Sequence, residues 1–284
     1  SGILKYRSAA LISSLAVLTG AIVGGAGGME TLSSLSSHTL LSASVNAAAA
    51  GISVLLLNRL GLPVSSSQAV VGSVIGIGLL EGGVDWLIVL KIAACWITTP
   101  LGSAIAAFLL YRLVGSAFRM IHSIQIQDLI LKALAIIIGG FGSFALGANN
   151  VANITGTFAD IIGIDKAVLI GGLSISAGAV MLSKRVMYTI GTRIVALESF
   201  ASVIALLAQS LTVLVYAFIG VPVSVSQAIV GAVIGVGLAR GSKNFDARLI
   251  RRILLGWVST PVISGLISLA LYIAVTSLAT HFGK

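Results

Sequence analysis

Hydrophobic residues form seven long runs along the chain, separated by short polar gaps. The runs cover 8–24, 39–60, 87–111, 129–147, 166–182, 199–219 and 253–280. The hydrocarbon core of a bilayer needs about 20 residues of helix, so each run predicts a membrane-crossing helix. Two shorter apolar stretches, 64–80 and 223–239, follow the second and sixth runs and are too short to cross fully. The pattern predicts an all-α polytopic membrane protein.

Composition supports this interpretation. Hydrophobic residues make up 57% of the chain and charged residues 9%, against roughly 25% charged residues in soluble domains. The net charge of +9 does not indicate nucleic-acid binding, because the basic residues sit in the gaps between apolar runs, as the positive-inside rule expects. Arg248, Arg251 and Arg252 are expected to face the cytoplasm and lipid headgroups. We therefore predict a multi-pass protein of the cell membrane.

The chain contains a sequence motif that occurs twice. PVSSSQAVVGSVIGIGL begins at Pro63, PVSVSQAIVGAVIGVGL begins at Pro222, and 13 of their 17 positions are identical. Trp96, Thr99 and Pro100 likewise match Trp257, Thr260 and Pro261. Internal duplication of this kind is typical of secondary transporters. We divide the chain into repeat one, residues 1–126, and repeat two, residues 127–284.

Charge indicates how the repeats are oriented. The gap after the first motif carries Glu81 and Asp85, whereas its counterpart carries Arg240, Lys243 and Arg248. Equivalent loops of opposite charge are expected on opposite faces of the membrane, so the repeats are predicted to be inverted. Repeat two opens with a helix predicted over 127–158 that has no counterpart in repeat one. We expect a preceding segment to carry a partner copy of its GANNVAN motif, and this chain alone to be incompetent for transport.

Each Pro-x-Ser motif predicts the tip of a re-entrant hairpin. Pro63 cannot continue a helix, and the serines after it can cap the next one. Free amides at a helix N-terminus, with the positive end of its dipole, attract anions. Inverted hairpins, 39–60 with 64–80 and 199–219 with 223–239, would bring their tips together near the membrane midplane. A surface loop is the alternative for one copy; two copies favour a buried tip, comprising Ser65, Ser66, Ser67, Gln68, Ser224, Ser226 and Gln227.

The second motif is GANNVANITGT, residues 147–157. Its side chains Asn149, Asn150, Asn153 and Thr157 interrupt an apolar helix without a full charge. In lipid such a cluster must face a cavity or another helix. Amides offer donors to an anion and carbonyl oxygens to a cation, so the motif is a candidate substrate site, with polar contacts between helices as the alternative. Gly147 and Gly156 would let the helix unwind there.

Together these motifs resemble the signatures of the inorganic phosphate transporter family, the Pit-type permeases. The resemblance covers most of repeat one and nearly all of repeat two. It implies a dimeric inverted-repeat symporter that takes up inorganic phosphate with sodium or protons and needs no cofactor. It also places the phosphate site, with a coupling sodium near Asn149, Asn150 and Asn153, on the residues named above.

This chain departs from the family pattern at three positions. Asn150 stands where aspartate is common, and Gln68 and Gln227 stand where histidine is common. Losing the carboxylate removes a sodium ligand, and losing the histidines removes groups that titrate near neutral pH. The coupling ion therefore stays open between sodium and proton, and the substrate between phosphate and sulfate. An anion channel is an alternative from another class. An enzyme is disfavoured, because no nucleophile–base pair or metal-ligand spacing is visible in the apolar runs.

Overall fold

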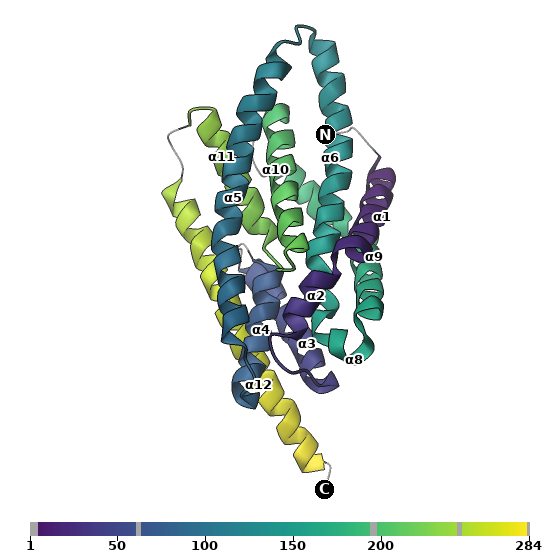
Figure 1. Cartoon of the computed structure of the whole chain (residues 1–284), viewed down its shortest axis with the longest axis vertical. Coiled ribbons are helices and arrows are strands. Elements are labelled where there is room, and N and C mark those ends of the chain that lie inside the picture. The colour runs from purple at the N-terminus through teal and green to yellow at the C-terminus, as the bar shows by residue number, and fades with distance from the viewer. Residues whose placement is uncertain (1–4, 61–63, 194–197, 243–245, 283–284) are drawn as a thin grey trace.

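The computed structural model of the chain describes residues 5–60, 64–193, 198–242 and 246–282, with the side chains of 182–193, 247 and 249 left out. The described residues form helices joined by short connections (Figure 1). In chain order the elements are α1 (Tyr6–Gly24), α2 (Ala26–Ser33), α3 (Leu40–Arg59), α4 (Ser66–Glu81), α5 (Trp86–Arg119), α6 (Ile124–Asn150), α7 (Ala152–Thr155), the 3₁₀ helix η1 (Gly156–Phe158), α8 (Ala159–Ile162), α9 (Ile164–Arg193), α10 (Ser199–Phe218), α11 (Val225–Ala239) and α12 (Ala247–Phe282).

The predicted membrane helices are confirmed. Among the described residues, seven helical segments are long and apolar enough to cross a membrane, and each overlaps one predicted run. The helices α4 and α11 are apolar but have only 16 and 15 residues, as the two short stretches predict. The all-α polytopic class follows directly from these lengths.

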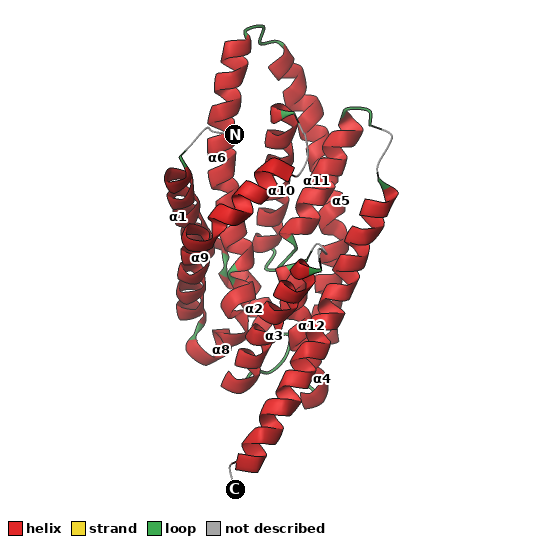
Figure 2. Cartoon of the chain, turned by 180° about the vertical axis from the view of Figure 1, so that it is seen from behind, coloured by secondary structure: helices red, strands yellow, loops and turns green. Residues whose placement is uncertain are grey.

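The hairpins α3–α4 and α10–α11 lie in opposite halves of the molecule. In Figure 1, α3 and α4 occupy the lower half and α10 and α11 the upper half, and Figure 2 shows the same division from behind. The N-termini of α4 and α11 lie in the middle of the molecule, where α6 also ends (Figure 1). The chain thus places both Pro-x-Ser tips and the asparagine-rich segment in one central region.

The asparagine-rich segment breaks its helix, as predicted, but earlier than the expected helix over 127–158. The continuous helix α6 ends at Asn150, and α7, η1 and α8 follow as single short turns. Gly156 lies in this bend and packs closely against α2. A Cβ built on it would lie 3.1 Å from Leu32 Cβ, which is closer than an ordinary van der Waals contact. The asparagine side chains bond outward to other elements, as shown below, and the broken helix turns back into α9 after Gly163, whose φ is +86°.

Each hairpin helix packs closely against a proline-containing long helix from the other half of the sequence. A Cβ built on Gly72 of α4 would lie 2.2 Å from the carbonyl oxygen of Pro261 in α12. The matching position, Gly231 of α11, would meet the carbonyl oxygen of Pro100 in α5 at 2.1 Å. Only glycine permits backbones to approach this closely. The repeated sequence therefore makes the same contact twice.

Charged side chains gather toward opposite ends of the molecule. Arg119 ends α5 and Arg240 follows α11, where its guanidinium lies 3.3 Å from the carboxylate of Glu198. Glu81 and Asp85 lie in the α4–α5 connection. In Figure 1 the α5–α6 connection is at the upper end and the α4–α5 connection is in the lower half. Pro63 and Lys243, which the sequence argument used, lie outside the described residues.

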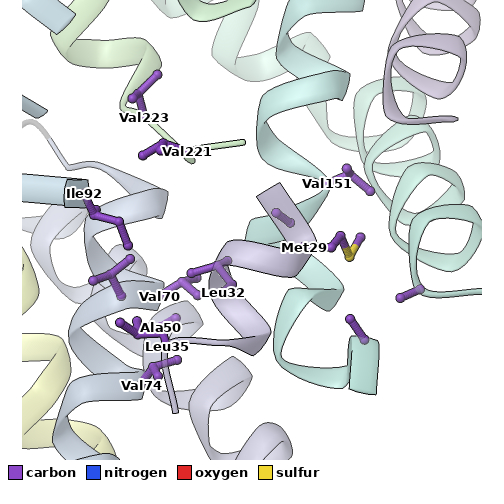
Figure 3. Close-up of a cluster of buried hydrophobic side chains, with 14 of the residues drawn as sticks. Met29, Leu32, Leu35, Ala50, Val70, Val74, Ile92, Val151, Val221 and Val223 are labelled. Atoms are coloured by element: carbon purple, nitrogen blue, oxygen red, sulfur yellow. The ribbon is translucent and has the colours of Figure 1, made fainter. Parts of the chain in front are cut away.

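The largest apolar core cluster surrounds the central region. Figure 3 shows Val221 and Val223 from the α10–α11 connection above Val70 of α4, with Val151 beside the end of α6. Val151, Val221 and Val223 are each 0% exposed. Polar groups of the tips therefore lie in apolar surroundings, where an unpaired donor or acceptor is costly.

Candidate functional site

The two hairpin tips touch through a matched pair of hydrogen bonds. The Ser67 hydroxyl donates to the Val223 carbonyl at 2.8 Å. The hydroxyl of Ser226, which is the counterpart of Ser67, donates to the carbonyl of Val64, the counterpart of Val223, at 3.4 Å. The prediction that the tips approach each other is confirmed.

Serine caps begin both hairpin helices at this junction. Ser65 caps α4 by accepting from the Gln68 N–H at 3.3 Å, and Ser224 caps α11 by accepting from the Gln227 N–H at 3.2 Å. Ser224 also bonds Ser226, with 2.8 Å between the hydroxyl oxygens. Two helix N-termini thus begin at the contact between the tips, and both bring the positive ends of their dipoles there.

Asn149 holds the second tip by its backbone. The Val223 N–H donates to Asn149 Oδ1 at 3.0 Å, and Asn149 Nδ2 donates to the Val223 carbonyl at 2.8 Å. The side chain is 1% exposed. Both ends of this amide are therefore occupied by the protein, and Asn149 acts here as a positioning residue for the tip.

Asn150 and Asn153 extend this network to the first tip. Asn150 Oδ1 accepts from Asn149 Nδ2 at 3.2 Å and from Asn153 Nδ2 at 2.8 Å. Asn153 Nδ2 also lies 3.0 Å from the Ser67 hydroxyl and 3.4 Å from the Ser66 hydroxyl. Ser66 is exposed and Asn150 is partly exposed, so the protein leaves this side of the cluster uncovered.

The structure does not bring every predicted site residue together. Thr157 is buried in η1, which packs on α2 and α3, and among the described residues its hydroxyl makes no hydrogen bond to the cluster. Gln68 and Gln227 adjoin the cluster in sequence and are both 3% exposed. Within the described part of the chain, neither side-chain oxygen has a hydrogen-bond donor.

Sequence reasoning missed the groups that join the elements. The carbonyls of Val64 and Val223 receive the bonds between the tips, and a backbone carbonyl has no residue signature. It also missed Asn46 of α3, which is 1% exposed and whose two amide atoms find no partner among the described residues. The available signal was an amide side chain near the middle of the predicted helix 39–60.

The chemistry of the cluster is that of neutral dipoles. Segments 64–68, 147–158 and 223–227 contain no ionisable side chain. No group of three His, Cys, Asp or Glu side chains that could hold a metal occurs in the described residues. Amide and hydroxyl donors beside two helix N-termini can bind a small oxyanion, while amide oxygens can contribute to a cation site.

Comparisons with known proteins point the same way. The family model described as phosphate transporter family matches residues 1–268. Sulfate permease CysP of Bacillus subtilis is 30% identical over 276 residues, covering 93% of this chain and 77% of that protein. Sodium-dependent phosphate transporter 1 of Xenopus tropicalis is 33% identical over 157 residues, covering 51% of this chain and 23% of that protein.

A solved structure shares the fold. A structure of the sodium-dependent phosphate transporter superposes with a TM-score of 0.81 at 22% sequence identity, covering 97% of this chain and 91% of that one. The arrangement of helices around the central cluster is therefore that of a known transporter fold.

Proposed function

This chain belongs to the phosphate transporter family, and from that premise we propose that it is an ion-coupled secondary transporter of inorganic phosphate across a membrane. It is a membrane protein with seven apolar helices of spanning length in its described part. The observation that carries the proposal is the meeting of two serine-capped helix N-termini with an asparagine-rich helix break. Such a site supplies several donors to one oxyanion without a fixed positive charge.

We propose that Asn150, Asn153, Ser66, Ser67 and Ser226 contact the anion. Gln68 and Gln227 stand next to them, and Asn149, Ser65 and Ser224 hold the tips in place. Thr157 stays a proposed substrate residue from its place in the GANNVANITGT motif, and it is buried in η1 beside α2 and α3.

Sodium is the proposed coupling ion. The names of the Xenopus relative and of the superposed structure both state sodium dependence. We propose that this sodium binds near Asn149, Asn150 and Asn153, where the resemblance to the family implies it. Proton coupling is the alternative, although the segments at the junction hold no group that titrates near neutral pH.

Two further features belong to the same proposal. The repeats 1–126 and 127–284 are proposed to be inverted. This is supported by the hairpins in opposite halves, the two equivalent glycine–proline contacts and the charge at each end.

We also propose a homodimer in the plasma membrane, with the exposed Arg248, Arg251 and Arg252 toward anionic lipid headgroups.

Sulfate is a second candidate substrate because the Bacillus relative that is 30% identical is a sulfate permease. Purified protein in liposomes tests both candidates, as this chain alone and with a preceding segment that carries a partner copy of GANNVAN; uptake by this chain alone would show that the expectation of incompetence is wrong. We expect radiolabelled phosphate to accumulate when an inward sodium gradient is imposed at equal pH on both sides. Accumulation of sulfate but not phosphate would overturn the substrate, and uptake driven only by a pH gradient would overturn sodium. Anion flux that never moves a second ion uphill would identify a channel.

A further inference from the structure

Three buried carbonyl oxygens at the central cluster have no hydrogen-bond donor among the described residues. They belong to Asn153, Gln68 and Gln227, whose side chains are 8%, 3% and 3% exposed. A buried acceptor that has lost water and gained no donor destabilises the protein, and most buried acceptors are paired. Three such oxygens in one region indicate that a ligand supplies the missing donors.

Backbone geometry fixes which atom of each asparagine is unpaired. The Val223 N–H can only donate and its carbonyl can only accept, so Asn149 must turn Oδ1 to the first and Nδ2 to the second. Asn149 Nδ2 and Asn153 Nδ2 then both donate to Asn150 Oδ1. Reversing the Asn153 amide would set two carbonyl oxygens against each other. Asn153 Oδ1 is therefore left as an acceptor, and Asn150 Nδ2 as a donor.

We infer that these oxygens accept hydrogen bonds from the protonated oxygen of the anion, and so select phosphate and arsenate over sulfate. The inference rests on the proposed transport of a tetrahedral oxyanion. Inorganic phosphate keeps at least one P–OH group around neutral pH, whereas sulfate is fully ionised and has none. The ionised oxygens would take the donors, namely Asn150 Nδ2 and the exposed Ser66 hydroxyl, which among the described residues only accepts a hydrogen bond, while the P–OH group meets an acceptor.

A cation is the other ligand that unpaired oxygens could serve, and the helix geometry disfavours it at the glutamines. Gln68 and Gln227 lie in the first turns of α4 and α11. The positive end of a helix dipole repels a cation there and attracts an anion. The segments at the junction also hold no carboxylate that would neutralise a cation.

The expected selectivity follows from the cost of an unpaired acceptor. Sulfate would keep the cluster's oxygens unpaired and place its own negative oxygens against them. An unsatisfied buried polar group costs enough to weaken binding by roughly 10- to 100-fold. Sites built around a substrate hydroxyl reject analogues without it in the same manner.

Competition against radiolabelled phosphate tests this without any mutation. At mildly alkaline pH, phosphate and arsenate are mainly dianions with one hydroxyl, whereas sulfate and monofluorophosphate are tetrahedral dianions with none. Charge and shape are thus matched, and only the donor differs. We expect arsenate to compete within a few-fold of phosphate, and sulfate and monofluorophosphate to compete about 10- to 100-fold more weakly. Equal competition by monofluorophosphate overturns the inference and leaves phosphate transport standing.

Variants assign the effect to residues. Gln68→Met and Gln227→Met remove one acceptor each at similar volume, and we expect each to reduce the ratio of phosphate to monofluorophosphate affinity by about fivefold or more. Ser73→Ala is the matched control on α4, because that hydroxyl bonds only its own helix, at Val70, and its ratio should stay unchanged. If the glutamine variants keep the ratio and instead shift the sodium concentration for half-maximal binding, the oxygens serve a cation and the inference is wrong. Absence of any phosphate binding would refute the proposed function itself.

Discussion

Replacing Gly72 by alanine should loosen the first hairpin and stop transport. The added Cβ would lie 2.2 Å from the Pro261 carbonyl oxygen and 2.5 Å from Pro261 Cα. Both neighbours are backbone atoms, so no side-chain rotation can relieve the overlap. Restoring ordinary contact requires the two helices to separate by about 1 Å, and such overpacking costs about 1–3 kcal/mol. Because the overlap is with backbone atoms, the upper part of this range, about 2–3 kcal/mol, applies. Alanine returns up to about 1 kcal/mol through helix propensity, so a net loss of about 1–2 kcal/mol is expected.

The same displacement reaches the site. Gly72 lies just over one helical turn from Ser67, whose 2.8 Å bond to the Val223 carbonyl joins the tips. Moving α4 by about 1 Å would stretch this bond past the useful range for a hydrogen bond. Phosphate uptake should therefore fall more than protein abundance does. Gly231→Ala should behave alike, because its Cβ would meet the Pro100 carbonyl oxygen.

The assay compares thermal unfolding in detergent with phosphate uptake in liposomes. Gly102→Ala is the control, since a Cβ there meets nothing within 4 Å, and it should be as stable as the wild type or slightly more so. The melting temperature of Gly102→Ala should be at or above that of the wild type, and the melting temperature of Gly72→Ala should be below it. If Gly72→Ala unfolds and transports like wild type, α4 is not held at Pro261 and the packing argument fails.

Three further outcomes can be checked. Asn149→Leu removes both bonds to Val223 and should abolish uptake. Asn149→Asp should also impair uptake, because it keeps the bond from the Val223 N–H but sets a buried oxygen against the Val223 carbonyl; normal uptake by either variant would contradict the clamp. Asn150→Asp should make anion binding depend more on sodium and weaken it without sodium, because a carboxylate repels the anion unless a cation intervenes. Asn150→Leu should impair uptake at every sodium concentration. Normal uptake by Asn150→Leu would show that Asn150 is not part of the site. Burial lowers the pKa of His38 below its ordinary 6.5, against the opposing effects of the Leu32 carbonyl, Asp160 and Glu81. The unfolded chain then binds the proton more readily, so the melting temperature should fall as pH drops below 6.5, and this slope should disappear in His38→Gln.

The sequence predicted the elements that repeat or have a fixed length. Seven apolar runs define seven spanning helices because bilayer thickness sets their length, and duplication of Pro-x-Ser located both tips. Contact between the tips followed from treating the two hairpins as equivalent. These features depend on patterns spread over many residues.

The different roles of three neighbouring asparagines could not be predicted. Asn149, Asn150 and Asn153 are chemically identical in the sequence, and only the positions of their partners distinguish them. Asn149 pairs with the backbone of Val223, which lies 74 residues away, and a valine carbonyl leaves no mark in a sequence. Thr157 shares the motif but turns away with η1, because the helix ends at Asn150 rather than running on to 158.

The lack of ionisable side chains at the meeting of the tips determines where membrane voltage can act. A transmembrane potential of 100 mV changes the energy of each charge that crosses it by about 2.3 kcal/mol. The binding segments 64–68, 147–158 and 223–227 contribute no charge of their own. When the loaded site changes sides, the charge moved is that of the anion plus its coupling ions. When the empty site returns, these segments move none, so we expect the return step to proceed at the same rate at any voltage.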